Sequence, residues 1–212
     1  MAFLYFWMDA KPFFVPIDAQ AIQPDETASL QDFFERCKEG NASGCFFVRI
    51  VSNVYLDSID PSLEENEHPP TNLRVGDAFL GKVYNAVRNS PAWKETVLVI
   101  TFDEHGGFYD PVPPPFNVPR PDDSPLNRPV SHFNFDRLGP RVPTIIVSPF
   151  VQRGGIVSQG ADGRIFEHSS IPATIKKLFG LSNFLTKRDA WAATFDNVIS
   201  LQAPRSDCPQ RL

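Results

Sequence analysis

Side chains that bind metals and transfer protons are concentrated in one short segment of this chain. Shortly after the apolar run Val97–Ile100 come Asp103, Glu104 and His105, followed by two adjacent glycines. Carboxylates and imidazoles bind divalent metal ions and move protons, and glycines allow positive φ or close backbone approach. The segment therefore predicts a metal-binding or acid–base loop. The competing interpretation is that these polar residues only begin a solvated loop or cap a helix.

This polar segment needs a rigid element to position it, and we expect Val97–Phe102 to be that element. A short apolar run that ends in turn residues is typical of a fully buried strand in a parallel sheet. In open α/β sheets, ligands bind at the carboxyl ends of strands, because the loops there converge on one crevice. The proline-rich segment Gly106–Leu138 is predicted to be one long functional or protective loop.

Helix-like and strand-like patterns alternate along the rest of the chain. The expected helices are Ser29–Lys38, Leu73–Asn89 and Ser170–Leu178, and the further expected strands are Cys45–Tyr55 and Val142–Val147. Ser170 is the expected N-cap of the last helix, and Val142–Val147 is expected to be buried like the strand before it. The alternation predicts an α/β fold, and no domain boundary is visible in the sequence.

Composition excludes several classes of protein. The chain has 212 residues, 42% of them hydrophobic, and a net charge of −5, which argues against a nucleic-acid binder with a basic face. No apolar run of about 18 residues occurs, so no transmembrane segment is expected. The apolar start MAFLYFWMDAKPFF lacks the basic region and cleavage site of a signal peptide, and is expected to be a core segment.

The three cysteines leave two alternatives open. Cys37 and Cys45 are eight residues apart across a glycine-containing loop, a spacing that suits a disulfide in an oxidising compartment. Buried free thiols are about equally expected, because free cysteine is commonly buried.

Five segments, read together, resemble the phosphoesterase family that includes non-specific phospholipase C and a bacterial acid phosphatase. The segments are NEHPPTNLRVGDAFLGKVYNAVRNSPAW (66–93), ITFDEHGGFYD (100–110), GPRVPTIIVSPFV (139–151), FEHSSIPATIKKLFGL (166–181) and FLTKRDAWAATF (184–195). The resemblance is strongest over 65–212. It implies an alkaline-phosphatase-like three-layer α/β sandwich with a mostly parallel sheet, incomplete at its N-terminus, and a single phosphoesterase domain over 1–212.

The resemblance also implies a chemistry. Members hydrolyse phosphate esters by a metal-assisted displacement through a phospho-enzyme, so we expect a divalent metal ion of unknown identity and a phospholipid or other phosphate-ester substrate. Asp103 and Glu104 match the family's acidic pair, which binds metal or organises the site, and they are the expected metal ligands. His68, His105 and Glu104 are the expected catalytic residues. His68 would donate to a phosphate oxygen or protonate the leaving alkoxide. Such a substrate allows peripheral membrane contact.

Two parts of the family pattern have no counterpart here. The upstream segments that carry the family's Ser or Thr nucleophile are not matched, and Thr101 within a strand and Ser148 in a Ser-Pro turn are poor substitutes. Pro111 stands where the family has a histidine. We therefore expect the nucleophile to lie outside this chain. A signal peptide on such an upstream part would imply secretion or membrane association. The alternative function is a truncated or inactive paralogue that acts as a binding module, and a sulfatase or phosphomutase is a weaker third.

Two further residues are candidates for substrate binding. Arg141 precedes a strand and is suited to bidentate contact with phosphate, although an ion pair with Asp136 or Asp110 is the simpler expectation. His168 lies just before a predicted helix, whose N-terminus favours anions. The alternative for His168 is that it only orders the entry to that helix.

Overall fold

The computed structural model describes residues 2–8, 30–41, 44–50, 67–123 and 133–212. The chain divides into two compact units, and each is described by itself. Unit 1 comprises Met1–Gly107, Val142–Phe150 and Gln202–Leu212, and unit 2 comprises Phe108–Arg141 and Val151–Leu201. The parts of the expected elements that fall in 51–66 and 124–132 lie outside the described residues. The single domain over 1–212 stays a prediction.

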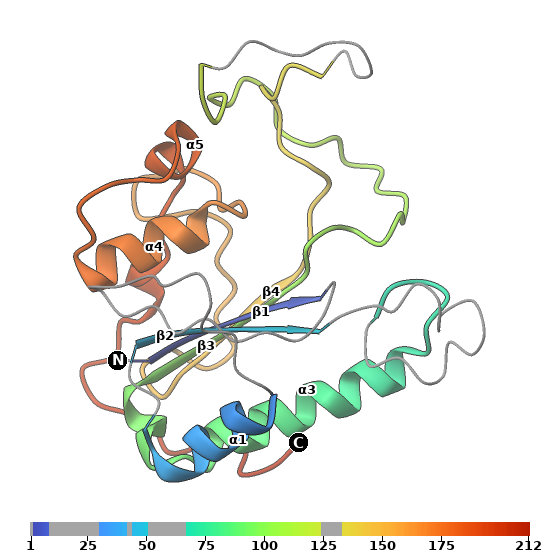
Figure 1. Cartoon of the computed structure of the whole chain (residues 1–212). Coiled ribbons are helices and arrows are strands. Elements are labelled where there is room, and N and C mark those ends of the chain that lie inside the picture. The colour runs from blue at the N-terminus through green and yellow to red at the C-terminus, as the bar shows by residue number, and fades with distance from the viewer. Residues whose placement is uncertain (1, 9–29, 42–43, 51–66, 124–132) are drawn as a thin grey trace. The chain divides into compact units, whose positions relative to one another are not determined.

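Unit 1 is built on a four-stranded sheet (Figure 1). Its strands are β1 (Ala2–Met8), β2 (Gly44–Ile50), β3 (Thr96–Thr101) and β4 (Thr144–Val147), in the order β2-β1-β3-β4. β1 runs parallel to both of its neighbours, whereas β4 is antiparallel to β3. The apolar start of the chain thus forms an inner strand. Helices and strands both occur along the chain, which agrees with the predicted α/β fold.

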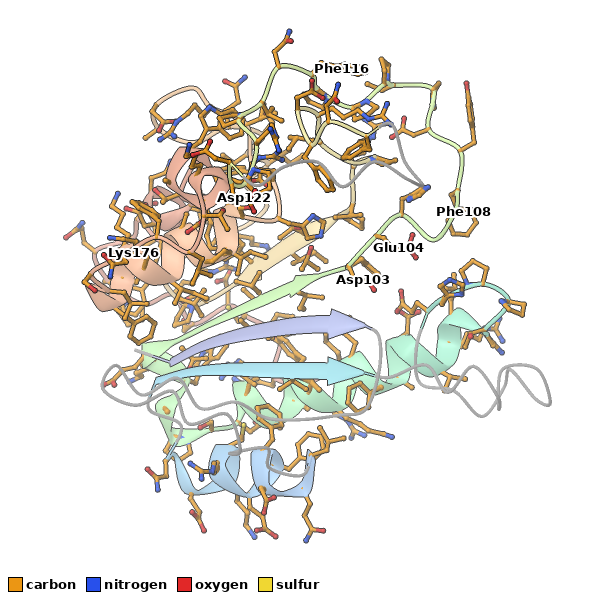
Figure 2. All side chains as sticks on the ribbon, turned by 45° about the horizontal axis from the view of Figure 1, so that its top comes forward. Asp103, Glu104, Phe108, Phe116, Asp122 and Lys176 are labelled. Carbon is orange, nitrogen blue, oxygen red and sulfur yellow. The ribbon has the colours of Figure 1, made fainter. Side chains whose placement is uncertain are left out.

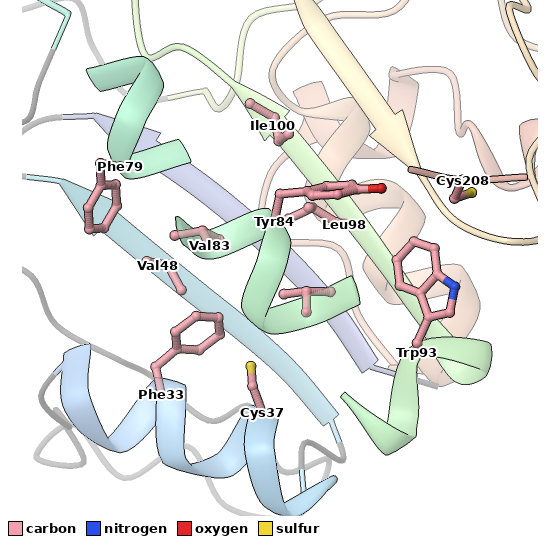
Figure 3. Packing of buried hydrophobic residues seen from close by; sticks show 11 residues of the cluster. Phe33, Cys37, Val48, Phe79, Val83, Tyr84, Trp93, Leu98, Ile100 and Cys208 are labelled. Atoms are coloured by element: carbon pink, nitrogen blue, oxygen red, sulfur yellow. The ribbon is translucent and has the colours of Figure 1, made fainter. Parts of the chain in front are cut away.

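Helices α1 (Leu30–Glu39) and α3 (Leu73–Arg88) lie on the same side of this sheet (Figure 1). Their bounds differ from the expected helices by at most one residue. The short 3₁₀ helix η2 (Pro91–Glu95) leads from α3 into β3. Side chains from these elements form one buried cluster (Figure 3). Its members are Phe33, Cys37, Val48, Phe79, Val83, Tyr84, Val87, Trp93, Leu98, Ile100 and Cys208.

β3 is the strand that leads to the candidate site, and all six of its residues are buried. Leu98 and Ile100 belong to the cluster beneath the helices. Val97 and Val99 are 1% and 0% exposed, and alternation along a strand directs them to the opposite face. The prediction of a fully buried strand is confirmed, and burial on both faces gives the loop after β3 a rigid support.

The prediction of a second fully buried strand at Val142–Val147 is wrong. The strand is shorter, and Thr144 and Ile145 are exposed, with 54% of the Ile145 surface accessible. The reason is the position of β4 at one end of the strand order, where it pairs with β3 alone in the described sheet. An apolar run has the same pattern at the edge of a sheet as at its centre.

Cys37 is a free, buried thiol on α1. Burial raises its pKa to about 12, so it stays protonated at neutral pH. Of the two alternatives for Cys37, the structure shows the buried free thiol.

Unit 2 contains helices α4 (Ser170–Phe179) and α5 (Lys187–Trp191) and the 3₁₀ helix η3 (Asp196–Val198). The N-cap of α4 is Ser169 rather than the expected Ser170, whose hydroxyl instead accepts a hydrogen bond from the Glu167 amide at 3.0 Å. Within 106–123 and 133–138 there is no helix or strand, as predicted for a long loop. Among the described helices, none combines the length and apolar character needed to span a bilayer.

Candidate active site

The loop after β3 holds two carboxylates in a compact turn. Figure 2 shows Asp103 and Glu104 just beyond the end of β3. An Asp103 side-chain oxygen accepts a hydrogen bond from the Glu104 amide at 3.0 Å, and Glu104 Oε2 accepts one from the Gly106 amide at 2.8 Å. Gly106 and Gly107 adopt φ of 67° and 73°, a region that side chains with a Cβ rarely enter. The two glycines therefore allow the chain to turn while Glu104 stays oriented.

His68 comes from a second element, the turn that precedes α3. The Thr71 amide donates to the His68 carbonyl at 2.8 Å, and the Asn72 side chain then caps α3 by accepting from the Arg74 amide. His68 Nδ1 lies 2.7 Å from the Pro69 carbonyl oxygen. A carbonyl only accepts, so Nδ1 carries a proton and Nε2 is the ring atom directed to the site.

The two elements bring all three predicted catalytic residues together. Glu104 Oε1 lies 3.9 Å from His68 Nε2, and Glu104 Oε2 lies 3.4 Å from His105 Nδ1. The carboxylate is thus flanked by an imidazole on either side. The side chains of His68, Glu104 and His105 are 59%, 46% and 34% exposed, so a ligand in solution has access to all three. This arrangement suits proton transfer to and from a bound substrate.

Glu67 is a residue of this region that sequence reasoning missed. Its side chain packs over Gly76 of α3, where a Cβ would lie 2.5 Å from Glu67 Cγ. Partial burial raises the pKa of the Glu67 carboxyl, and the negative charge of Asp77 raises it further. Gly76 is one of two glycines in α3, and a glycine within a helix is the only sequence signal that could have pointed to this close contact.

Asp103 and Glu104 were predicted to bind a divalent metal ion. In the described part of the chain, no group of three or more His, Cys, Asp or Glu side chains is arranged to hold a metal ion. Catalytic sites usually supply three protein ligands to zinc and more oxygen ligands to harder cations. Asp103 and Glu104 therefore do not make a complete metal site by themselves.

Arg141 and His168 belong to unit 2. Arg141 Nε lies 2.8 Å from Asp110 Oδ2 in an ion pair in which Asp110 is the more buried partner. The predicted salt link of Arg141 is thereby confirmed with Asp110. His168 is exposed in the turn before α4, and its carbonyl accepts a hydrogen bond from the Ile171 amide at 3.2 Å. Their roles in substrate binding stay predictions.

Comparison with known proteins decides the family. The model of the phosphoesterase family matches residues 19–182, which include every candidate residue described above. The chain belongs to the phosphoesterase family. The family resemblance inferred from the sequence motifs is therefore confirmed.

Curated members of the phosphoesterase family are similar to this chain over part of their length. Non-specific phospholipase C6 of Arabidopsis thaliana is 55% identical over 69% of this chain and 29% of its own length. Non-specific phospholipase C5 of the same plant is 45% identical over 85% of this chain and 34% of its own length. Phospholipase C B of Mycobacterium tuberculosis (strain H37Rv) is 29% identical over 74% of this chain and 32% of its own length. The chain thus spans about a third of the length of these relatives.

Proposed function

We propose that this chain forms part of the active site of a phosphoester hydrolase of the phospholipase C type, with a phospholipid or related phosphate ester as substrate. The observation that carries the proposal is the Glu104 carboxylate between the imidazoles of His68 and His105. Membership of the phosphoesterase family and the names of the phospholipase C relatives support the reaction class. We also propose the alkaline-phosphatase-like three-layer sandwich as the complete fold.

In this proposal His68 is the proton donor. Its Nδ1–H donates to the Pro69 carbonyl, so the proton given to the leaving alkoxide or to a phosphoryl oxygen comes from Nε2 of the doubly protonated imidazolium, which is left as the neutral ring with its proton on Nδ1. Glu104 orients both imidazoles through its two carboxylate oxygens. Arg141 and His168 are proposed to bind the phosphate group.

The nucleophile is proposed to come from outside the described residues. Thr101 is 2% exposed, and its hydroxyl lies 2.7 Å from that of Thr144. Ser148 is also 2% exposed, and its hydroxyl accepts from the Phe150 amide at 3.3 Å. Burial keeps both hydroxyls from attacking a phosphate ester, which agrees with the sequence argument against them.

We also propose that the site binds a divalent metal ion, with Asp103 and Glu104 as two of its ligands. Isothermal titration with Mn²⁺, Ca²⁺ and Zn²⁺ tests it without requiring turnover. We expect saturable binding of one of these ions that weakens at least tenfold in Asp103→Ala, because loss of one ligand removes a direct metal bond. Equal binding by the wild type and Asp103→Ala would remove Asp103 from the site.

The function is tested on protein that includes the nucleophile-bearing segment, with p-nitrophenylphosphorylcholine, a soluble phosphodiester, with and without divalent metal. His68→Gln is expected to lower turnover by about 10²–10⁴-fold, the usual contribution of general acid catalysis. Glu104→Gln is compared with Glu95→Gln, the same change at an exposed carboxylate of η2. Turnover that stays at the wild-type level in each of the single variants His68→Gln and Glu104→Gln would refute the proposed roles.

Binding separates the main proposal from its alternative. NMR signals of the His68 ring are followed while phosphocholine is added to the wild type. Shifts at His68 without hydrolysis, in protein that includes the nucleophile-bearing segment, favour the inactive paralogue that acts as a binding module. The absence of both the NMR shifts and hydrolysis would overturn both functions.

A further inference from the structure

Exposed apolar side chains are concentrated in unit 2. Of the twelve large hydrophobic side chains that are exposed among the described residues, nine belong to this unit. They are Phe108, Tyr109, Val112, Phe116, Phe135, Ile156, Val157, Phe184 and Leu185. Apolar side chains scattered singly need no explanation, so only those that lie together indicate an interaction surface.

The same unit is basic although the chain as a whole is acidic. Unit 2 contains ten Lys and Arg against eight Asp and Glu, a net charge of +2. Unit 1 contains ten Lys and Arg against seventeen Asp and Glu, a net charge of −7. A surface that combines exposed apolar groups with positive charge complements the polar boundary of an anionic lipid bilayer.

Four residues of unit 2 form an ordered cluster that we call the aromatic ribbon: Phe116, Phe133, Phe135 and Arg137. Phe116 and Arg137 face each other in an antiparallel bridge, and Figure 2 shows Phe116 on the loop that carries it. The Arg137 guanidinium lies 4.8 Å from the Phe133 ring centroid and 5.9 Å from that of Phe116. Phe133 and Phe135 meet edge to face at 4.9 Å. The cluster therefore presents a cation held between aromatic rings.

The aromatic ribbon is fixed by the backbone around it. The Val118 amide donates to the Asp136 carbonyl at 3.0 Å, and the Leu138 amide donates to the Pro115 carbonyl at 2.9 Å. The guanidinium of Arg188 on α5 donates to the carbonyls of Pro119 and Phe135, each at 2.5 Å. Despite this order, Phe116 and Phe135 remain 57% and 47% exposed. Preorganised side chains lose little entropy when they bind a surface.

We propose that the aromatic ribbon docks on a phospholipid bilayer that contains anionic lipid. The exposed rings of Phe116 and Phe135 enter the boundary between headgroups and acyl chains, and Arg137 binds lipid phosphate with its planar guanidinium. The docking deepens the proposed function, because a bilayer presents the phospholipid substrate. It is measured by binding alone, and hydrolysis of the soluble substrate is measured without a bilayer, so either can fail separately.

Cosedimentation with large unilamellar vesicles tests the docking. The two vesicle compositions are pure phosphatidylcholine and equimolar phosphatidylcholine and phosphatidylserine. Phe116→Ser is expected to weaken partition into the mixed vesicles about tenfold, the value of burying roughly half of a Phe side chain. Arg137→Gln is expected to weaken it about fivefold on mixed vesicles and less on the pure vesicles, because only the anionic surface adds a net attraction for the lost charge to its contact with lipid phosphate.

Leu73→Ser is the matched control, because Leu73 is 56% exposed and lies in unit 1. It should bind the mixed vesicles like the wild type, and circular dichroism confirms that each variant is folded. Wild-type protein that fails to sediment with either vesicle overturns the proposal. Phe116→Ser that binds as tightly as the wild type overturns it as well. Concentration-dependent dimerisation that Phe116→Ser abolishes, without vesicle binding, would assign the surface to a second copy of the chain.

Discussion

Replacement of Gly76 by alanine tests the contact between α3 and Glu67. In an unobstructed helix interior, glycine to alanine stabilises a protein by about 1 kcal/mol. At Gly76 the new Cβ would lie 2.5 Å from Glu67 Cγ, a mid-chain atom that cannot move without the whole side chain. Overpacking of this kind costs about 1–3 kcal/mol. Gly76→Ala is therefore expected to change the free energy of unfolding by between about 0 and −2 kcal/mol.

The same helix offers a matched control. A Cβ at Gly81 would have only the Leu212 carbonyl oxygen nearby, at 3.9 Å, an ordinary contact distance. Gly81→Ala should therefore stabilise the chain by about 1 kcal/mol. Removal of the obstacle should restore this gain at the first site, so that Gly76→Ala stabilises by about 1 kcal/mol in a Glu67→Ala background.

Urea denaturation followed by circular dichroism measures all of these variants. The coupling free energy between Gly76→Ala and Glu67→Ala is expected to be about 1–3 kcal/mol. Equal stabilisation by Gly76→Ala and Gly81→Ala in the wild-type background would refute the contact. So would a coupling free energy near zero, because it would mean that Glu67 avoids the new methyl group without cost.

Three further predictions concern pH and buried hydrogen bonds. Burial and Asp77 raise the pKa of Glu67 above its ordinary value of 4.5, so the native state binds this proton more tightly than the unfolded chain. The wild type should lose stability relative to Glu67→Gln as pH rises from about 4.5, and a pH-independent difference in urea midpoint would contradict this. Thr174→Val should lower the free energy of unfolding by about 1–3 kcal/mol, because the buried hydroxyl accepts a hydrogen bond from the Phe195 amide at 3.1 Å. Thr174→Ser keeps a hydroxyl, so it should lower the free energy of unfolding by less. Asp189→Ala should cost about 2 kcal/mol in thermal or urea unfolding, since this buried carboxylate caps α5 and accepts from the Leu185 amide at 2.8 Å; a wild-type midpoint would disprove the cap's contribution.

Local patterns predicted those elements whose signal is local. α3 follows from a stripe of apolar residues at helical spacing, and β3 from an uninterrupted apolar run, and both lie within one residue of their expected ends. The exposure of Ile145 was not predictable in this way, because it depends on where β4 lies in the sheet. The shift of the α4 N-cap to Ser169 reflects a choice between two adjacent serines that sequence preference does not separate.

The candidate site was predictable only in part. The cluster of Asp103, Glu104 and His105 is visible in the sequence because its members are contiguous. His68 was joined to them through the family resemblance, since no spacing rule brings that turn to the end of β3. The contact of Glu67 with Gly76 was missed, because it depends on the path of the chain before α3.

The distance between His68 and Glu104 is set by one hydrophobic core. His68 lies just before α3, and Glu104 lies just after β3, so each residue is placed by the element next to it. Val83 of α3 and Leu98 of β3 are both fully buried in the same cluster (Figure 3). Close-packed interiors transmit small shifts, so a volume change at either position displaces one element relative to the other. Such core residues act on the His68–Glu104 pair without touching it, because they hold the two elements that carry it.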